Sequence, residues 1–200
     1  TVTIAGIHIG DGYPCRLVAE LGTNHLGNVR LALKMIEAAK AAGADFIKLQ
    51  KRSPDLSVPK AEWNELRDTP WGTMTKLDYR KRVEFGRDEY IAVDAHCRAI
   101  GIPWFCSVWD IPSVRFLKHL PCDFFAIKIP SARVTDLDLL AEVNYHQKHT
   151  ILSTGMSTWE EVQRAFIALP FHNTIVLQCT SAYPAKADES NLRVMETYRR

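Results

Sequence analysis

The sequence has little that would point to a membrane, secreted or nucleic-acid-binding protein. No apolar run approaches the roughly 20 residues that span a bilayer, and the first residues lack the zones of a secretory signal. Arg80-Lys81-Arg82 is the densest basic cluster in a chain of formal net charge +2, and a solvated helix face explains it. We therefore expect a cytoplasmic protein with neither a nucleic-acid nor a membrane partner.

The sequence also has few cysteines and none of several common catalytic motifs. The five cysteines are scattered without a C-x-x-C pair, which indicates reduced thiols and makes a metal cluster of cysteines improbable. There is no Ser-His-Asp order, Walker loop, G-x-G-x-x-G or H-E-x-x-H. These absences argue against the common hydrolase, nucleotide-binding and zinc-protease classes. The cysteines are Cys15, Cys97, Cys106, Cys122 and Cys179.

What the sequence does contain is a repeated alternation of short apolar runs with helical segments. Such alternation predicts βαβ units and a parallel sheet. The expected strands are 16–20, 45–50, 102–107, 123–131, 150–153 and 174–179, and the expected helices are 29–42, 87–100, 112–120, 136–146, 158–169 and 188–200. A complete (β/α)8 barrel has more units and about 250 residues. We therefore expect either an incomplete barrel of about six units or an open doubly wound sheet.

Two segments stand apart from this alternation. Residues 1–12 alternate polar and apolar side chains and end in a Gly-Asp-Gly turn, which predicts a hairpin or plug before the catalytic domain at 13–200. Residues 51–84 contain prolines and two tryptophans and read as a long lid or binding loop. Lys51, Arg52, Lys60 and Arg67 are available there for substrate selection.

Polar side chains collect at the ends of the expected strands, where ligands bind in parallel sheets and barrels. They are Glu20, Lys48, Gln50, Ser107, Lys128, Ser131, Ser153, Thr154, Ser181 and Tyr183. A lysine inside an apolar strand is costly to bury unless an anion meets it. Lys48 and Lys128, with these hydroxyls and the Gly155 turn amides, therefore predict a pocket for a dianion such as phosphate.

Several of these residues have simpler interpretations. Each serine alone is as well explained as a turn or cap residue. Glu20 is either a general acid or base, a partner for a sugar hydroxyl, or a buried ion-pair partner of Lys48. His25 is either a substrate contact or a packed loop histidine.

Five blocks of the sequence resemble the sialic acid synthases, which make N-acetylneuraminate and related nonulosonic acids. They are Ala19-Glu20-Leu21-Gly22-Thr23-Asn24-His25-Leu26-Gly27, Phe46-Ile47-Lys48-Leu49-Gln50, Lys128-Ile129-Pro130-Ser131, Leu152-Ser153-Thr154-Gly155-Met156-Ser157 and Gln178-Cys179-Thr180-Ser181-Ala182-Tyr183-Pro184. The resemblance implies a (β/α)8 TIM-type barrel and a transferase. Such an enzyme condenses phosphoenolpyruvate with an N-acyl hexosamine such as N-acetylmannosamine and releases phosphate. It also implies a divalent metal, Mn or Mg, that polarises the sugar aldehyde.

Carried over by position, the resemblance assigns roles to the strand-end residues. Glu20, Lys48, Lys128 and Tyr183 would be catalytic, with Glu20 and Tyr183 facing the amino sugar. The substrate-binding set would be Asn24, His25, Gln50, Ser107, Ser131, Ser153 and Ser181. Ser107 stands where relatives often have threonine, and Ser181 where some have asparagine; both keep a polar group.

The resemblance also implies parts that this sequence does not contain. The metal-binding histidines and a small antifreeze-like domain would follow Arg200, and the full-length protein would be a homodimer. Two rival hypotheses remain open. One is an aldolase-type barrel in which Lys128 forms a Schiff base. The other is a metal-less, truncated relative that binds ligand without turnover.

Overall fold

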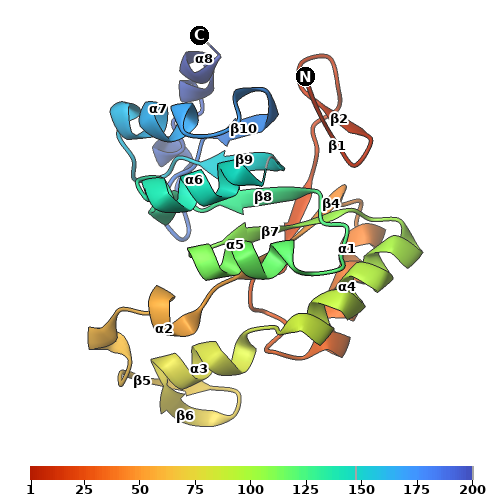
Figure 1. The fold of residues 1–200 in the computed structure, drawn as a ribbon, viewed down its shortest axis with the longest axis vertical. Coiled ribbons are helices and arrows are strands. Elements are labelled where there is room, and N and C mark those ends of the chain that lie inside the picture. Colours follow the sequence, from red (N-terminus) through yellow and green to blue (C-terminus); the bar gives the residue numbers. More distant parts are fainter. Residues whose placement is uncertain (147, 200) are drawn as a thin grey trace. The chain divides into compact units, whose positions relative to one another are not determined.

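The computed structural model describes residues 1–146 and 148–199. The chain divides into two compact units, Pro14–Phe124 and the combination of Thr1–Tyr13 with Phe125–Arg200. Each unit contains parallel strands followed by helical segments, as the alternating sequence predicts (Figure 1).

The unit Pro14–Phe124 is built on a parallel sheet. Its strands are β3 (Val18–Glu20), β4 (Phe46–Lys51) and β7 (Trp104–Val108), and its main helices are α1 (Val29–Ala41), α4 (Arg87–Ile100) and α5 (Ile111–Lys118). β4 pairs with β3 on one side and with β7 on the other. All of these elements lie within two residues of the expected starts and ends, because their caps are encoded locally. Asn28, for example, accepts a hydrogen bond from the Leu31 N–H at the start of α1.

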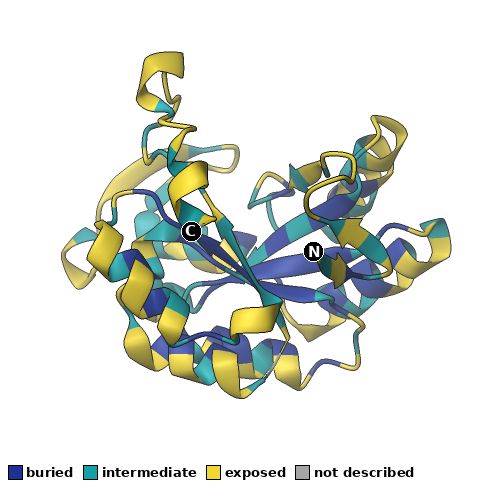
Figure 2. Ribbon diagram, turned by 90° about the horizontal axis from the view of Figure 1, so that it is seen from above, coloured by how far each residue is buried: buried dark blue, intermediate teal, exposed yellow. Residues whose placement is uncertain are grey.

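Burial differs along this sheet. Every residue of β7 is buried, and Phe46, Ile47 and Leu49 of β4 are buried as well, as expected for strands of a parallel sheet (Figure 2). The prediction of a buried first strand is wrong, since Val18 in β3 is 43% exposed. β3 lies at the end of its sheet and pairs with β4 alone among the residues that the structure describes.

Residues 51–84 form a small folded lobe, so the prediction of a long loop is wrong. The lobe contains α2 (Pro54–Ser57), the 3-10 turn η1 (Lys60–Glu62), β5 (Leu66–Thr69), β6 (Gly72–Thr75) and α3 (Lys76–Val83). β5 and β6 pair antiparallel as a hairpin. The Trp63 indole N–H donates to the Val58 carbonyl at 2.9 Å, which anchors one of the two tryptophans inside the lobe.

The second unit combines the predicted N-terminal hairpin with three parallel strands. The hairpin is β1 (Val2–Ile4) with β2 (Ile7–Ile9), and the parallel strands are β8 (Ala126–Ile129), β9 (His149–Ser153) and β10 (Thr174–Leu177). The helical segments are η2 (Ser131–Arg133), α6 (Leu137–Tyr145), α7 (Trp159–Ile167), η3 (Phe171–Asn173), η4 (Ala187–Glu189) and α8 (Val194–Tyr198). β9 pairs with both β8 and β10.

The expected last helix from residue 188 is shorter in the structure. Its first turn is η4, and α8 begins only at Val194. Between them Asn191 has a φ of 48°, a left-handed conformation that interrupts a right-handed helix. No helix among the described residues has both the length and the apolar character needed to cross a membrane.

Gly27 provides a test of how tightly the loop after β3 is held. A Cβ on Gly27 would collide with the backbone carbonyl of Arg82, whereas one on Gly43 would meet nothing within 4 Å. Both glycines have positive φ, 71° and 91°. We expect Gly43→Ala to lower the free energy of unfolding by about 1 kcal/mol from the φ alone, and Gly27→Ala by about 3 kcal/mol or more because backbone must also move. Urea unfolding measures both, and equal losses would show that the contact is unimportant.

Candidate functional site

One polar cluster lies where β3, β4 and β7 end. The Glu20 carboxylate forms an ion pair with the Lys48 ammonium group. Lys48 also donates to the Ser107 hydroxyl at 3.2 Å. The strand register explains this meeting, because Glu20 lies opposite Lys48 and Gln50 lies opposite Ser107. The structure therefore brings together predicted residues from three separate strands.

Because Gly22 has no side chain, there is space beside it that the side chains of Glu20, Asn24 and Gln50 border. A Cβ built on Gly22 would lie 3.5 Å from Glu20 Oε1, 3.7 Å from Gln50 Nε2 and 3.9 Å from Asn24 Nδ2. A carboxylate and two amides thus surround a position that carries no side chain. Amides and a carboxylate are suited to the hydroxyl and N-acyl groups of a sugar, since together they donate and accept hydrogen bonds.

Glu20 and Lys48 form the ion pair that was one of the interpretations left open by the sequence. The Lys48 side chain is 15% exposed and that of Glu20 is 46% exposed. The cation of this pair is therefore the more buried partner, and its charge is already balanced. Glu20 keeps access to solvent, so a ligand can reach its carboxylate.

His25 is buried in the loop after β3 and packs against protein. Its ring stacks on Phe85 with 3.8 Å between centroids, and its Nδ1 accepts from the Gly27 N–H at 3.1 Å. Burial lowers the pKa of His25 from 6.5 to about 4, although a hydrogen bond with the Gly22 backbone opposes the shift. Of the two interpretations, the geometry matches the packed loop histidine.

Lys128, the second predicted lysine, lies on β8 in the other unit. Burial lowers the pKa of Lys128, and the charge of Cys179 works in the opposite direction. Within residues 1–146 and 148–199, no carboxylate forms an ion pair with this ammonium group. Lys128 therefore differs from Lys48, whose charge Glu20 balances.

Gly155, in the turn after β9, lies against two of the predicted serines. Its N–H donates to the Ser131 hydroxyl at 3.0 Å. A Cβ on Gly155 would overlap the Ser181 hydroxyl and would lie 3.0 Å from that of Ser131. Hydroxyls that follow β8 and β10 thus converge on a residue that must have no side chain. Ser153, at the end of β9, is buried two residues before this turn.

Tyr198 supports the same turn and was not identified from the sequence. Its hydroxyl donates to the Thr154 hydroxyl at 2.9 Å and lies 3.3 Å from Gln178 Oε1. Its ring stacks on Trp159, with 5.9 Å between centroids. Nothing in the sequence distinguished Tyr198 from other residues of a C-terminal helix. Tyr183, in contrast, is 98% exposed and joins no cluster in its unit.

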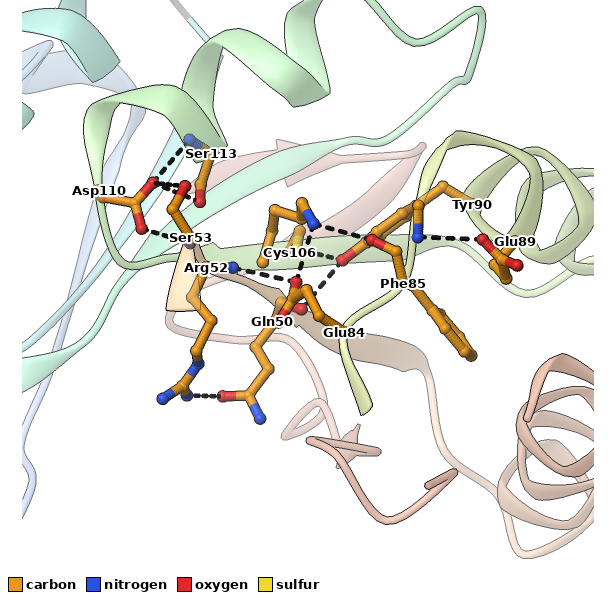
Figure 3. A network of polar contacts seen from close by, with 12 residues as sticks. Gln50, Arg52, Ser53, Glu84, Phe85, Glu89, Tyr90, Cys106, Asp110 and Ser113 are labelled. Carbon is orange, nitrogen blue, oxygen red and sulfur yellow. Dashed lines mark hydrogen bonds and ion pairs between the residues drawn. The ribbon is translucent and has the colours of Figure 1, made fainter. Parts of the chain in front are cut away.

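Polar residues behind β4 form a network that sequence reasoning also missed. Lys51 donates to Glu84 Oε1 at 3.0 Å and to the Phe85 carbonyl at 2.8 Å. The Tyr90 hydroxyl donates to the Gln50 carbonyl at 2.9 Å (Figure 3). Burial raises the pKa of Glu84, although the positive charge of Lys51 acts in the opposite direction. Lys51 is thus engaged within the protein, and this network holds the end of β4 in place.

The metal implied by the resemblance was tested against the side chains of this chain. Throughout the described ranges, no three His, Cys, Asp or Glu residues are grouped so that they could hold a metal ion. The divalent metal expected from the resemblance stays a prediction.

His25 gives a pH dependence with a defined sign. In the unfolded chain the His25 ring binds a proton near pH 6.5, whereas in the folded chain the same ring binds it only near pH 4. Stability should therefore fall as the pH falls from about 6.5 to about 4. His25→Asn keeps a hydrogen-bond acceptor but does not titrate. We expect it to reduce the slope of the free energy of unfolding against pH in this range, by up to the slope that about one bound proton gives. Urea unfolding at several pH values measures the slope, and an unchanged slope would contradict the assignment.

Comparison with known proteins places this chain in a family. A sequence model of the NeuB family matches residues 35–200. The chain is 31% identical over 199 residues to an N-acetylneuraminate-9-phosphate synthase of Mus musculus, an alignment of 98% of this chain and 55% of that protein. It is 30% identical over 199 residues to an N,N'-diacetyllegionaminic acid synthase of Legionella pneumophila, covering 94% and 55%. The chain thus spans about half the length of the curated relatives it matches.

A solved structure supports the same relationship. An N-acetylneuraminic acid synthetase from Leptospira borgpetersenii, in complex with citrate, matches with a TM-score of 0.86 and 26% identity, over 99% of this chain and 65% of that one. This match confirms the expected α/β fold, a (β/α)8 TIM-type barrel of which part is present. The chain belongs to the NeuB family.

Proposed function

We propose that this chain carries the phosphoenolpyruvate-binding part of a nonulosonic acid synthase. Such a transferase condenses phosphoenolpyruvate with an N-acyl hexosamine, such as N-acetylmannosamine, and releases phosphate. The observation that carries the proposal is Lys128, a cation whose pKa is lowered by burial and which has no carboxylate partner in the described part of the chain. A buried cation of this kind is stabilised by an anionic ligand.

The Gly155 turn would hold the phosphoryl group beside Lys128. The hydroxyls of Ser131 and Ser181 and the Gly155 N–H already lie together there. Hydroxyl and amide donors fit phosphoryl oxygens, and charge-assisted hydrogen bonds are the stronger ones. Ser153 would line the same site. The role of these groups is to bind and orient phosphoenolpyruvate without chemical change to the protein.

The resemblance also assigns Lys48 and Ser107 to phosphoenolpyruvate. The Lys48–Ser107 hydrogen bond fixes an ammonium group and a hydroxyl at the ends of β4 and β7. Glu20 orients that ammonium and keeps its own carboxylate partly exposed.

The acceptor sugar would contact Glu20, Asn24 and Gln50 around Gly22. Glu20 is the residue of this group that can hold or release a proton during attack on the sugar carbonyl. The part assigned to Tyr183 rests on the resemblance alone, since its side chain is 98% exposed. A cytoplasmic location and a homodimer at full length belong to the same proposal; free cysteines support the first.

A Schiff-base mechanism is the second candidate, because a lowered lysine pKa also favours a neutral amine nucleophile. The lowered pKa of Lys128 is the observation in its favour. Borohydride reduction in the presence of pyruvate separates the two candidates. A covalent adduct on Lys128 would establish the imine and contradict the condensation proposed here.

Lys128→Ala tests the proposed binding of phosphoenolpyruvate. We expect the affinity to fall by roughly 30-fold or more, because the anion would lose its buried cationic partner. Isothermal titration calorimetry with phosphoenolpyruvate measures the loss. Lys34→Ala, which removes an exposed lysine from α1, is the matched control and should bind as the wild type does. Equal affinities for the two variants would refute the assignment of Lys128.

A further inference from the structure

Arg52 follows β4 directly, and its side chain lies beside the candidate acceptor site. Its Nη2 donates to Gln50 Oε1 at 2.6 Å, and Figure 3 shows the guanidinium and the amide end to end. Its guanidinium also lies over the Trp109 ring, 4.2 Å from the centroid. The residue is only 8% exposed. Arg52 is therefore a buried cation next to a residue proposed to contact the sugar.

Hydrogen-bond donors at this point lack acceptors. Within the described part of the chain, Arg52 Nε and Trp109 Nε1 are buried and neither has a hydrogen-bond partner. Buried donors without acceptors are destabilising and uncommon in native proteins. Two of them in stacked side chains indicate that an acceptor belongs beside them.

The nearby carboxylates are engaged with other donors. Asp110 accepts from the Ser53 N–H at 2.6 Å and from the Ser113 N–H at 2.8 Å, as Figure 3 shows. Glu84 accepts from Lys51 at 3.0 Å and from the Arg52 backbone N–H at 3.2 Å. Their charges reach Arg52 only through space. The guanidinium is thus without a direct anionic partner among the residues described.

A second guanidinium, that of Arg80 on α3, adds to the positive charge. Burial lowers the pKa of Arg52 to about 10, and the charge of Arg80 is the next largest cause. Two like charges that act on each other are stabilised by an anion that binds to both. No ion pair to Arg80 exists in the described ranges. Arg80 belongs to the 51–84 lobe, so this lobe supplies a second positive charge that acts on Arg52.

We propose that Arg52, Arg80 and Trp109 form a second anion subsite that takes the phosphoryl group of a phosphorylated hexosamine acceptor. The guanidinium fork matches phosphoryl oxygens, and the indole N–H supplies one more donor. The proposal rests on the proposed function. Phosphoenolpyruvate already has Lys128 and the Gly155 turn in the other unit, whereas Arg52 contacts Gln50 of the acceptor group.

Calorimetric titration of the 200-residue chain tests this subsite with two sugars, N-acetylmannosamine 6-phosphate and N-acetylmannosamine. We expect wild type to bind the phosphorylated sugar more tightly. Arg80→Gln and Arg52→Gln should each weaken that binding by roughly tenfold or more, and Arg80→Gln should leave the affinities for N-acetylmannosamine and phosphoenolpyruvate unchanged. Arg82→Gln is the matched control, because it removes an exposed guanidinium from the same helix, stacked on Trp71 at 4.2 Å.

Three outcomes would overturn the subsite. They are equal affinity of wild type for the two sugars, full binding of the phosphorylated sugar by Arg80→Gln, and a loss that falls on phosphoenolpyruvate instead. If Arg52→Gln does not fold, as judged by circular dichroism, Arg80→Gln decides, since Arg80 is only partly buried. A separate titration with phosphoenolpyruvate alone reports on the proposed function. Its failure would therefore be seen independently of the sugar result.

Discussion

An ammonium group that leaves water without meeting a carboxylate is destabilising, and Lys128 is in that position on β8. The strand around it is buried and apolar, so the protein cannot solvate the charge fully. The Gly155 turn beside the next strand gathers hydroxyls and an N–H that favour an anion. Burial of Lys128 and the donors of this turn are the two features on which the proposed anion site rests.

Lys48, the lysine near the end of β4, has an environment different from that of Lys128. Lys48 is paired with Glu20 and hydrogen-bonded to Ser107, so its position is fixed before any ligand arrives. Arg52, two residues beyond Gln50, is buried without such a partner. Cations with partners thus provide geometry, and cations without partners provide binding energy for anions. Lys128, at the proposed phosphoenolpyruvate site, and Arg52, at the proposed sugar-phosphate subsite, both lack such a partner in the described part of the chain.

Much of the fold follows from local sequence signals, whereas parts of the site depend on tertiary packing. Parallel strands bring their carboxyl ends to one edge, so the meeting of Glu20, Lys48 and Ser107 was predictable from strand ends. The folded lobe at 51–84 could not be predicted from the sequence, because its hairpin strands are short and exposed. The set of donors around Arg52 could not be predicted either, because it depends on contacts between separate elements.

The most direct measurement is an NMR titration of the Lys128 side chain, assigned with Lys128→Arg, in the free chain and with saturating phosphoenolpyruvate. The account predicts that the ammonium of the free chain loses its proton below the ordinary pH range of lysine, since burial lowers its pKa. Phosphoenolpyruvate should raise that pKa, because a bound dianion stabilises the charged form. An ordinary pKa that phosphoenolpyruvate leaves unchanged would contradict the account.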